Sequence, residues 1–179
     1  WDLGSYAVAA GMLAERFPAD PNNYALTCDQ IAEVLYQDSY MDNPGLFDIV
    51  DDAGWDPTYV DVDFWYYTLG VSGLIDAFNA SGTHTTEIPG LVTRLADSTY
   101  PSGAVSGSYG ANTDDEDWQS TAYAAAALAH LDQPAYQTEI DGMAAWLAST
   151  QDVSGAWKYS NGNHYPEVGG ENTMGLYFG

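Results

Sequence analysis

Basic residues are nearly absent from this sequence. It has 3 Lys and Arg side chains against 26 Asp and Glu, which gives a formal net charge of −23 at pH 7. Binding to nucleic acid or to anionic membranes depends on Lys and Arg, so neither is expected as a partner. Repulsion among so many like charges destabilises the compact state unless salt screens it. The composition therefore predicts a high-salt environment, or a surface that binds cations.

Cysteine and long apolar runs are also scarce. The single cysteine, Cys28, excludes an internal disulfide and is expected to be a small core residue. No apolar run is long enough to cross a bilayer, so membrane insertion is not expected. The tripeptide Asn79-Ala80-Ser81 is a glycosylation sequon, which favours an exported protein. With 179 residues, of which 46% are hydrophobic, the chain is predicted to form one domain, 1–179.

An internal repeat is the main positive signal. The segment 146–157 matches the segment 94–105, which lies 52 residues earlier, so that Gly155 falls on Gly103. A looser copy covers 34–47. A period of this length is typical of proteins that stack one supersecondary unit on the next, and here it gives about three and a half units.

Each unit is predicted to hold two helices. The second helix of a unit starts near an acidic residue and is apolar almost all round, so we expect it to be buried; these acids are Asp2, Asp63, Asp117 and Glu171. The first helix is amphipathic, with apolar residues at helical spacing; these are Ile31, Val34 and Leu35, then Leu91 and Leu95, then Met143, Trp146 and Leu147. The predicted helices are 2–17, 27–38, 63–79, 86–98, 117–131, 136–150 and 171–178.

Two motifs of the repeat carry a family resemblance. The first is Gln151 followed by Gly155-Ala156-Trp157, and the second is Asp117 followed by Thr121-Ala122-Tyr123. They resemble the Gln-Trp motif and the inner-helix start of the squalene-cyclase and prenyltransferase superfamily. The resemblance implies an all-α fold of repeated helical hairpins that form part or all of an α/α toroid. It says little about chemistry, because one fold hosts many functions.

The catalytic motifs of that superfamily are incomplete here. Its cyclases use the pattern Asp-x-Asp-Asp-Thr-Ala, and the matching residues are Asp117-Trp118-Gln119-Ser120-Thr121-Ala122. Gln119 and Ser120 stand where the acids would be, and neither can deliver a strong-acid proton. The zinc site of the prenyltransferases needs three convergent ligands, and Cys28 has no histidine at ligand spacing. Neither activity is expected, and no cofactor is required.

A carbohydrate-active enzyme stays open as an alternative. Asn163-His164-Tyr165 resembles the carboxylate-neutralising pair and the tyrosine base of α/α-toroid lyases. The competing interpretation is a polar turn between two helices. A lyase would also need an Arg to lower the pKa of the tyrosine, and this chain has few.

Acidic and aromatic residues at the inner-helix starts have two interpretations each. Asp63 and Asp117 either cap helices or line a cavity mouth that binds Ca²⁺ or a sugar. The run Asp114, Asp115, Glu116 and Asp117 either forms a calcium site or a solvated loop. The aromatic residues either bind a ligand such as a carbohydrate or fill the core; they are Trp65, Tyr66, Trp118 and Tyr123.

The leading hypothesis is a non-catalytic module of an exported or cell-surface protein that serves ligand binding or assembly. A carbohydrate-active enzyme is the first alternative, and a terpenoid-cyclase relative is the second. The chain holds fewer helices than a closed toroid needs. We therefore expect both terminal helices to be covered, by further copies of the chain in an oligomer or filament, or by remaining chain.

Overall fold

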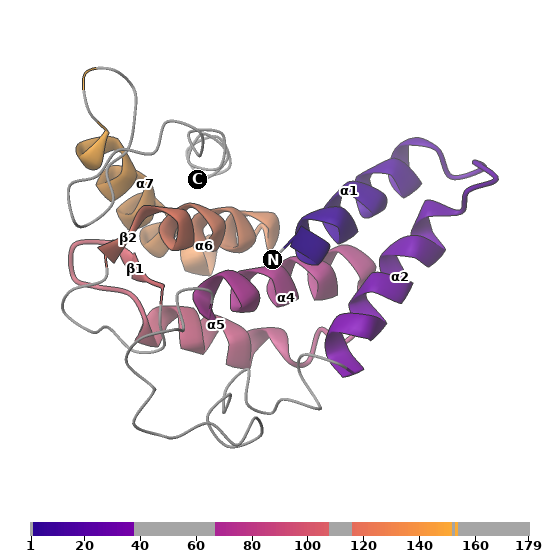
Figure 1. Ribbon diagram of the computed structural model, residues 1–179, viewed down its shortest axis with the longest axis horizontal. Coiled ribbons are helices and arrows are strands. Elements are labelled where there is room, and N and C mark those ends of the chain that lie inside the picture. Colours follow the sequence, from indigo (N-terminus) through magenta and orange to yellow (C-terminus); the bar gives the residue numbers. More distant parts are fainter. Residues whose placement is uncertain (1, 38–66, 108–115, 152, 154–179) are drawn as a thin grey trace. The chain divides into compact units, whose positions relative to one another are not determined.

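The computed structural model describes residues 2–37, 67–107, 116–151 and 153. In these ranges the chain forms helices joined by turns, with one pair of two-residue strands (Figure 1). The α-helices are α1 (Asp2–Arg16), α2 (Tyr24–Leu35), α4 (Tyr67–Ser81), α5 (Ile88–Asp97), α6 (Trp118–His130) and α7 (Gln137–Thr150). A short 3-10 helix, η3 (Pro134–Tyr136), precedes α7. The predicted all-α class is confirmed for this part of the chain, and the toroid stays a prediction.

The predicted helix positions agree closely with these elements. α5, α6 and α7 differ from the predicted ranges by at most two residues at either end, and α1 ends one residue early. α2 begins at Tyr24, three residues before its predicted start. The predicted helix 171–178 lies outside the described residues. None of the helices in the described ranges combines the length and hydrophobicity of a membrane span.

The strands β1 (Val105–Ser106) and β2 (Glu116–Asp117) were not predicted. They pair antiparallel, with Val105 opposite Asp117 and Ser106 opposite Glu116. Both lie in or beside the segment 99–116, between the predicted helices 86–98 and 117–131. Strands of two residues are too short to show an alternating pattern, so periodicity could not find them.

The chain divides into two compact units. The first contains α1, α2, α4 from Gly70 onward and the start of α5 as far as Leu91. The second contains α4 up to Leu69, α5 from Val92, the strand pair, α6 and α7.

In the first unit, small residues let helices approach closely. A Cβ atom on Gly4 of α1 would overlap the backbone of Gly73 in α4, and one on Gly11 would lie 3.4 Å from the Ala80 oxygen. The buried Cys28 of α2 donates its S–H to the Ala7 carbonyl at 3.3 Å. Cys28 is therefore a core residue, as predicted.

The predicted buried faces of α1 and α2 were wrong. The buried residues of α2 are Cys28 and Ala32, and Val34 is half-exposed. α2 contacts its neighbours through small side chains, so its largest apolar residues do not mark its inner face. α1 was expected to be buried all round, yet several of its large side chains face solvent.

In the second unit, the predicted core residues of α7 are buried, namely Met143, Trp146 and Leu147. α6 is buried along nearly its whole length. Gly103, in the turn before β1, has φ of 94° and touches the backbone of Gly142 in α7. A residue other than glycine at position 103 would adopt this positive φ only with strain, and its Cβ atom would overlap the Gly142 carbonyl oxygen. The glycine of the repeat therefore lets the loop contact the following helix directly.

Candidate functional site

Asp117 lies at the junction of β2 and α6, where the resemblance places the first cyclase acid. It is the N-cap residue of α6, with φ −107° and ψ 123°. Its Oδ2 accepts a hydrogen bond from the Ser120 N–H at 2.7 Å, and the residue is only 3% exposed. This is the geometry of a helix cap, in which a carboxylate satisfies a free N–H group and complements the helix dipole.

Thr121 ties α6 to the strand pair. Its hydroxyl donates to the Asp117 carbonyl at 2.6 Å and accepts the Val105 N–H at 2.8 Å. Both Thr121 and Val105 are fully buried. One side chain thus satisfies a buried backbone donor of β1 and fixes the helix start against the strand.

Ser120 occupies the position where the cyclases carry an acid. Its hydroxyl is fully buried, and in the described structure it has no hydrogen-bond partner. A buried polar group in this state lowers stability, because it has lost its water and gained nothing in exchange. Sequence reasoning singled out this position for its missing acid but could not detect the unpartnered hydroxyl.

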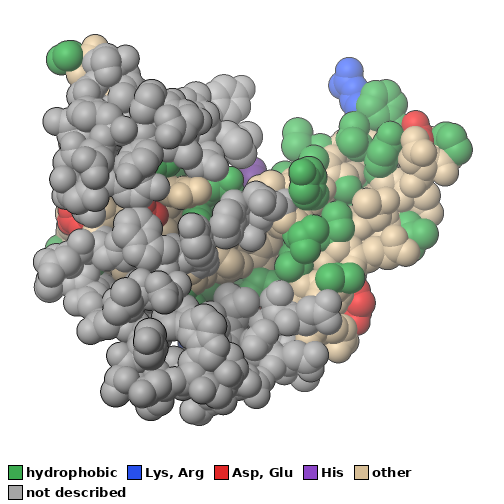
Figure 2. Space-filling model, viewed as in Figure 1, with side chains coloured by type: hydrophobic (Ala, Val, Ile, Leu, Met, Phe, Trp, Pro, Cys, Tyr) green, Lys and Arg blue, Asp and Glu red, His purple; other side chains and the backbone are tan. Residues whose placement is uncertain are grey.

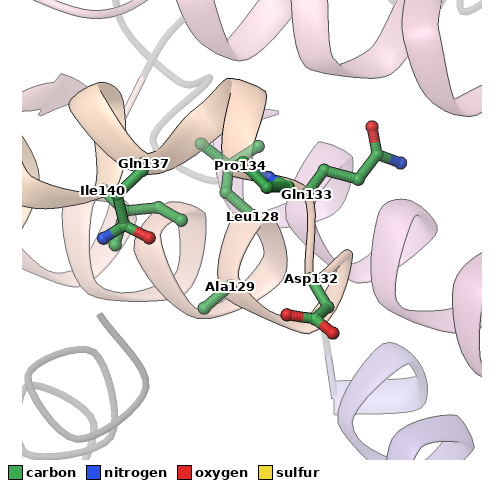
Figure 3. A pocket seen from close by; sticks show the side chains of 7 residues that line it. All are labelled: Leu128, Ala129, Asp132, Gln133, Pro134, Gln137 and Ile140. Carbon is green, nitrogen blue, oxygen red and sulfur yellow. The ribbon is translucent and has the colours of Figure 1, made fainter.

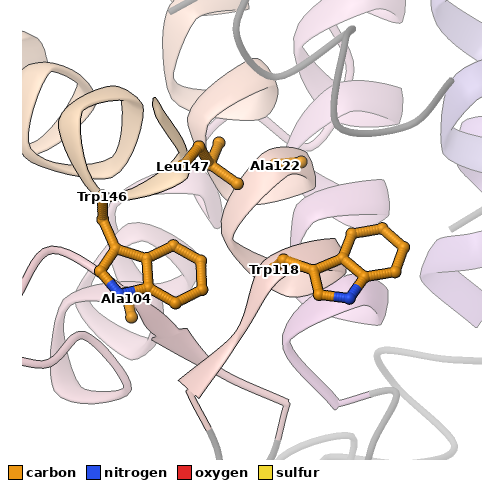
Figure 4. Close-up of a cluster of buried hydrophobic side chains, with 5 residues drawn as sticks. All are labelled: Ala104, Trp118, Ala122, Trp146 and Leu147. Carbon is orange, nitrogen blue, oxygen red and sulfur yellow. The ribbon is translucent and has the colours of Figure 1, made fainter. Parts of the chain in front are cut away.

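The core next to the start of α6 is apolar. Trp118 lies in a cluster with Ala104, Ala122, Trp146 and Leu147 (Figure 4). Tyr100 packs against the cluster from its edge. Trp118 is only 1% exposed, so its indole belongs to the buried core of this unit. Tyr123, one turn further along α6, is partly buried.

The described part of the predicted calcium loop makes contacts of its own. The Glu116 carboxylate of β2 accepts a hydrogen bond from the Ser102 hydroxyl, in the turn before β1, at 2.6 Å, and the Asp117 carboxylate caps α6. No cluster of three metal-ligating side chains occurs among the residues that the structure describes. Asp114 and Asp115 lie outside them, so calcium binding stays a prediction.

Other predicted site residues also lie outside the described ranges. They are Asp63, Trp65 and Tyr66 of the predicted inner-helix start and Asn163, His164 and Tyr165 of the predicted lyase triplet.

A pocket that the sequence did not predict lies where α6 turns into α7 (Figure 3). Its volume is about 300 Å³, at the lower end of the range for small-molecule sites. Its lining mixes apolar and polar side chains from both helices and the turn between them; the residues are Leu128, Ala129, Asp132, Gln133, Pro134, Gln137 and Ile140. Asp132 has φ of 49°, which marks the tight turn that forms the pocket.

A second surface feature belongs to the first unit. Figure 2 shows hydrophobic side chains gathered over α1 and α2. The most exposed large ones on or next to α1 are Tyr6 at 65%, Met12 at 65%, Phe17 at 52%, Leu3 at 43% and Leu13 at 38%.

Comparison of the chain with protein-family models, with curated proteins and with solved structures finds no match.

Proposed function

We propose that this chain is a non-catalytic helical module, built as part or all of an α/α toroid, that serves ligand binding or assembly. It would belong to an exported or cell-surface protein in a high-salt environment. The net charge of −23 supports the high-salt setting, because salt is what weakens such self-repulsion.

The observation that supports a non-catalytic role is the helix cap that Asp117 forms at the start of α6. Of the three positions at which the cyclases have acids, only Asp117 is acidic, and its carboxylate already accepts the Ser120 N–H. Thr121 is likewise engaged between Asp117 and Val105. These bonds give both side chains a structural task at the place where a cyclase would hold its proton donor.

The variant Asp117→Asn separates the two roles of this carboxylate. Asparagine caps helices about as well as aspartate but cannot donate an acid proton. We expect wild type and variant to melt at similar temperatures and to leave squalene, oxidosqualene and a panel of polysaccharides unchanged. As a control, Asp117→Ala should lose about 1 kcal/mol of stability, because it removes the cap.

Product formation by the wild-type chain would contradict the proposal. If that activity disappeared in Asp117→Asn while the melting temperature stayed the same, Asp117 would be an acid catalyst. If it persisted in Asp117→Asn, the catalytic group would lie elsewhere.

A further inference from the structure

The pocket between α6 and α7 contains one charged side chain, the carboxylate of Asp132. The other lining residues are apolar or carry an uncharged amide, and no Lys, Arg or His is among them. Among the residues that the structure describes, the one salt bridge joins His84 to Glu33, so Asp132 has no cationic partner there. Within this part of the chain, the pocket therefore presents a negative charge that no side chain neutralises.

The turn between the two helices does not require this carboxylate. Asp132 follows Leu131, the C-cap residue of α6, and has the left-handed φ of 49°. Glycine and asparagine usually fill this position, because they adopt the conformation most readily. The turn is closed by main-chain bonds such as that from the Asp132 N–H to the Ala129 carbonyl at 3.0 Å. An acid here also faces the negative end of the α6 dipole, so local structure disfavours the carboxylate, whereas a bound cation would stabilise it.

Apolar groups lie beside the carboxylate. In Figure 3, Asp132 lies at one end of the pocket and Ile140 at the other, with Leu128, Ala129 and Pro134 between them. Leu128 is 2% exposed and Ile140 is 5% exposed, so these two side chains form a buried apolar floor. A ligand that fits this lining has a positively charged head and a short hydrocarbon body.

We propose that this pocket binds a small aliphatic amine in its protonated form, with the ammonium group at Asp132 and the alkyl chain on the apolar floor. This inference rests on the ligand-binding part of the proposed function. The volume of about 300 Å³ accommodates a chain of a few carbon atoms. An anionic ligand is disfavoured, because the lining has no basic group and the net charge of −23 repels it.

The chain itself supplies few groups that could neutralise Asp132. Of its 3 Lys and Arg side chains, Arg16 and Arg94 belong to α1 and α5 and do not line the pocket. Lys158, outside the described residues, is the one internal ammonium group of a side chain. The strongly negative field of the chain meanwhile concentrates cations from solution. An external amine is therefore favoured over a covering segment of the same chain, and Lys158 defines the alternative to be tested.

Amide NMR titration with n-pentylammonium chloride, at constant ionic strength, tests the site. Saturable shifts should be largest for amides within 128–140, with a dissociation constant on the order of 1–10 mM, as expected for a small ligand in an open pocket. 1-Pentanol has a similar shape without the charge, so it should bind about fivefold more weakly. n-Propylammonium should bind at least about threefold more weakly, since each buried methylene group strengthens binding by up to about fourfold.

Two variants test the charge and the space of the pocket separately. Asp132→Asn removes the charge but suits the turn, so it should melt no lower than wild type while the dissociation constant rises about fivefold. Glu139→Gln is the matched control, because Glu139 is an exposed acid of α7 that does not line the pocket, and it should leave the constant unchanged. Ala129→Leu fills part of the pocket and should abolish the shifts. Helical circular dichroism checks that each variant is folded.

Several results would overturn the inference. Equal binding of 1-pentanol would show that charge plays no part, and an equal loss of affinity in Asp132→Asn and Glu139→Gln would assign binding to the general negative field. A wild-type chain whose pocket amides do not respond to n-pentylammonium would also overturn it. A response that then appeared in Lys158→Gln would identify the chain's own lysine as the occupant. None of these outcomes bears on the Asp117 test, so the two proposals fail independently.

Discussion

The buried hydroxyl of Ser120 gives the sharpest stability prediction. Its oxygen is fully buried and has no hydrogen-bond partner among the residues that the structure describes, and such a group costs about 1–3 kcal/mol relative to the exposed state. Ser120→Ala removes the oxygen and keeps the backbone N–H that Asp117 caps. The small gap that it leaves offsets part of the gain, so we expect the free energy of unfolding to rise by about 1 kcal/mol. For a chain of this length that corresponds to a melting temperature about 2–4 °C higher.

Thr121→Val is the matched opposite change, one residue further along the same helix. It keeps the volume but removes the hydroxyl that accepts the Val105 N–H, leaving a buried backbone donor unsatisfied. We expect a loss of about 1–3 kcal/mol. Urea unfolding of both variants at one high salt concentration would measure the two effects side by side. If Ser120→Ala were destabilised as strongly as Thr121→Val, the Ser120 hydroxyl would have a partner, and the reasoning would be refuted.

Two further predictions concern solution conditions. The net charge of −23 should make the melting temperature rise steeply with added salt, and a melting temperature that is indifferent to salt would remove the high-salt interpretation. The second concerns Glu33, whose pKa is lowered below its usual 4.5 by the hydrogen bond from Gln37 and, next, by His84 at 3.0 Å. A lowered folded-state pKa adds stability above the unfolded pKa, and this is lost as pH falls through the folded one. Glu33→Gln should therefore flatten the decline of melting temperature below about pH 4.5, and an unchanged acid decline would contradict the assignment.

Helix positions in this chain could be predicted because they depend on local patterns. Leu91 and Leu95 on α5, and Met143 and Leu147 on α7, recur at the helical period and are buried as expected. The same reasoning predicted the wrong buried face for α2. Its inner face is made of Cys28 and Ala32, and periodicity read from large residues cannot recognise a face made of small ones.

The site could be predicted only in part, for a similar reason. That an acid before an apolar helix caps it is a local rule, and the structure shows Asp117 in this role. The bond from the Val105 N–H to Thr121 joins residues 16 positions apart, and it depends on how β1 meets α6. No residue spacing in the sequence indicates this tertiary contact between β1 and α6. The exposure of Leu3, Tyr6 and Leu13 on α1 is also a tertiary property, since apolar residues at this spacing are typical of the buried face of an amphipathic helix.

The contact between Gly103 and Gly142 has a consequence for engineering. Because main-chain atoms meet there, the separation between this loop and α7 is fixed by the backbone, and repacking of the surrounding side chains cannot adjust it. A designer who builds an array from this repeat could therefore vary the apolar residues broadly while keeping glycine at position 103. Position 142 is less restricted, because a Cβ atom there would lie 3.9 Å from the Gly103 Cα, an ordinary contact distance. Gly155 matches Gly103 in the following copy of the sequence repeat, so the corresponding glycine of an array would be placed at that position.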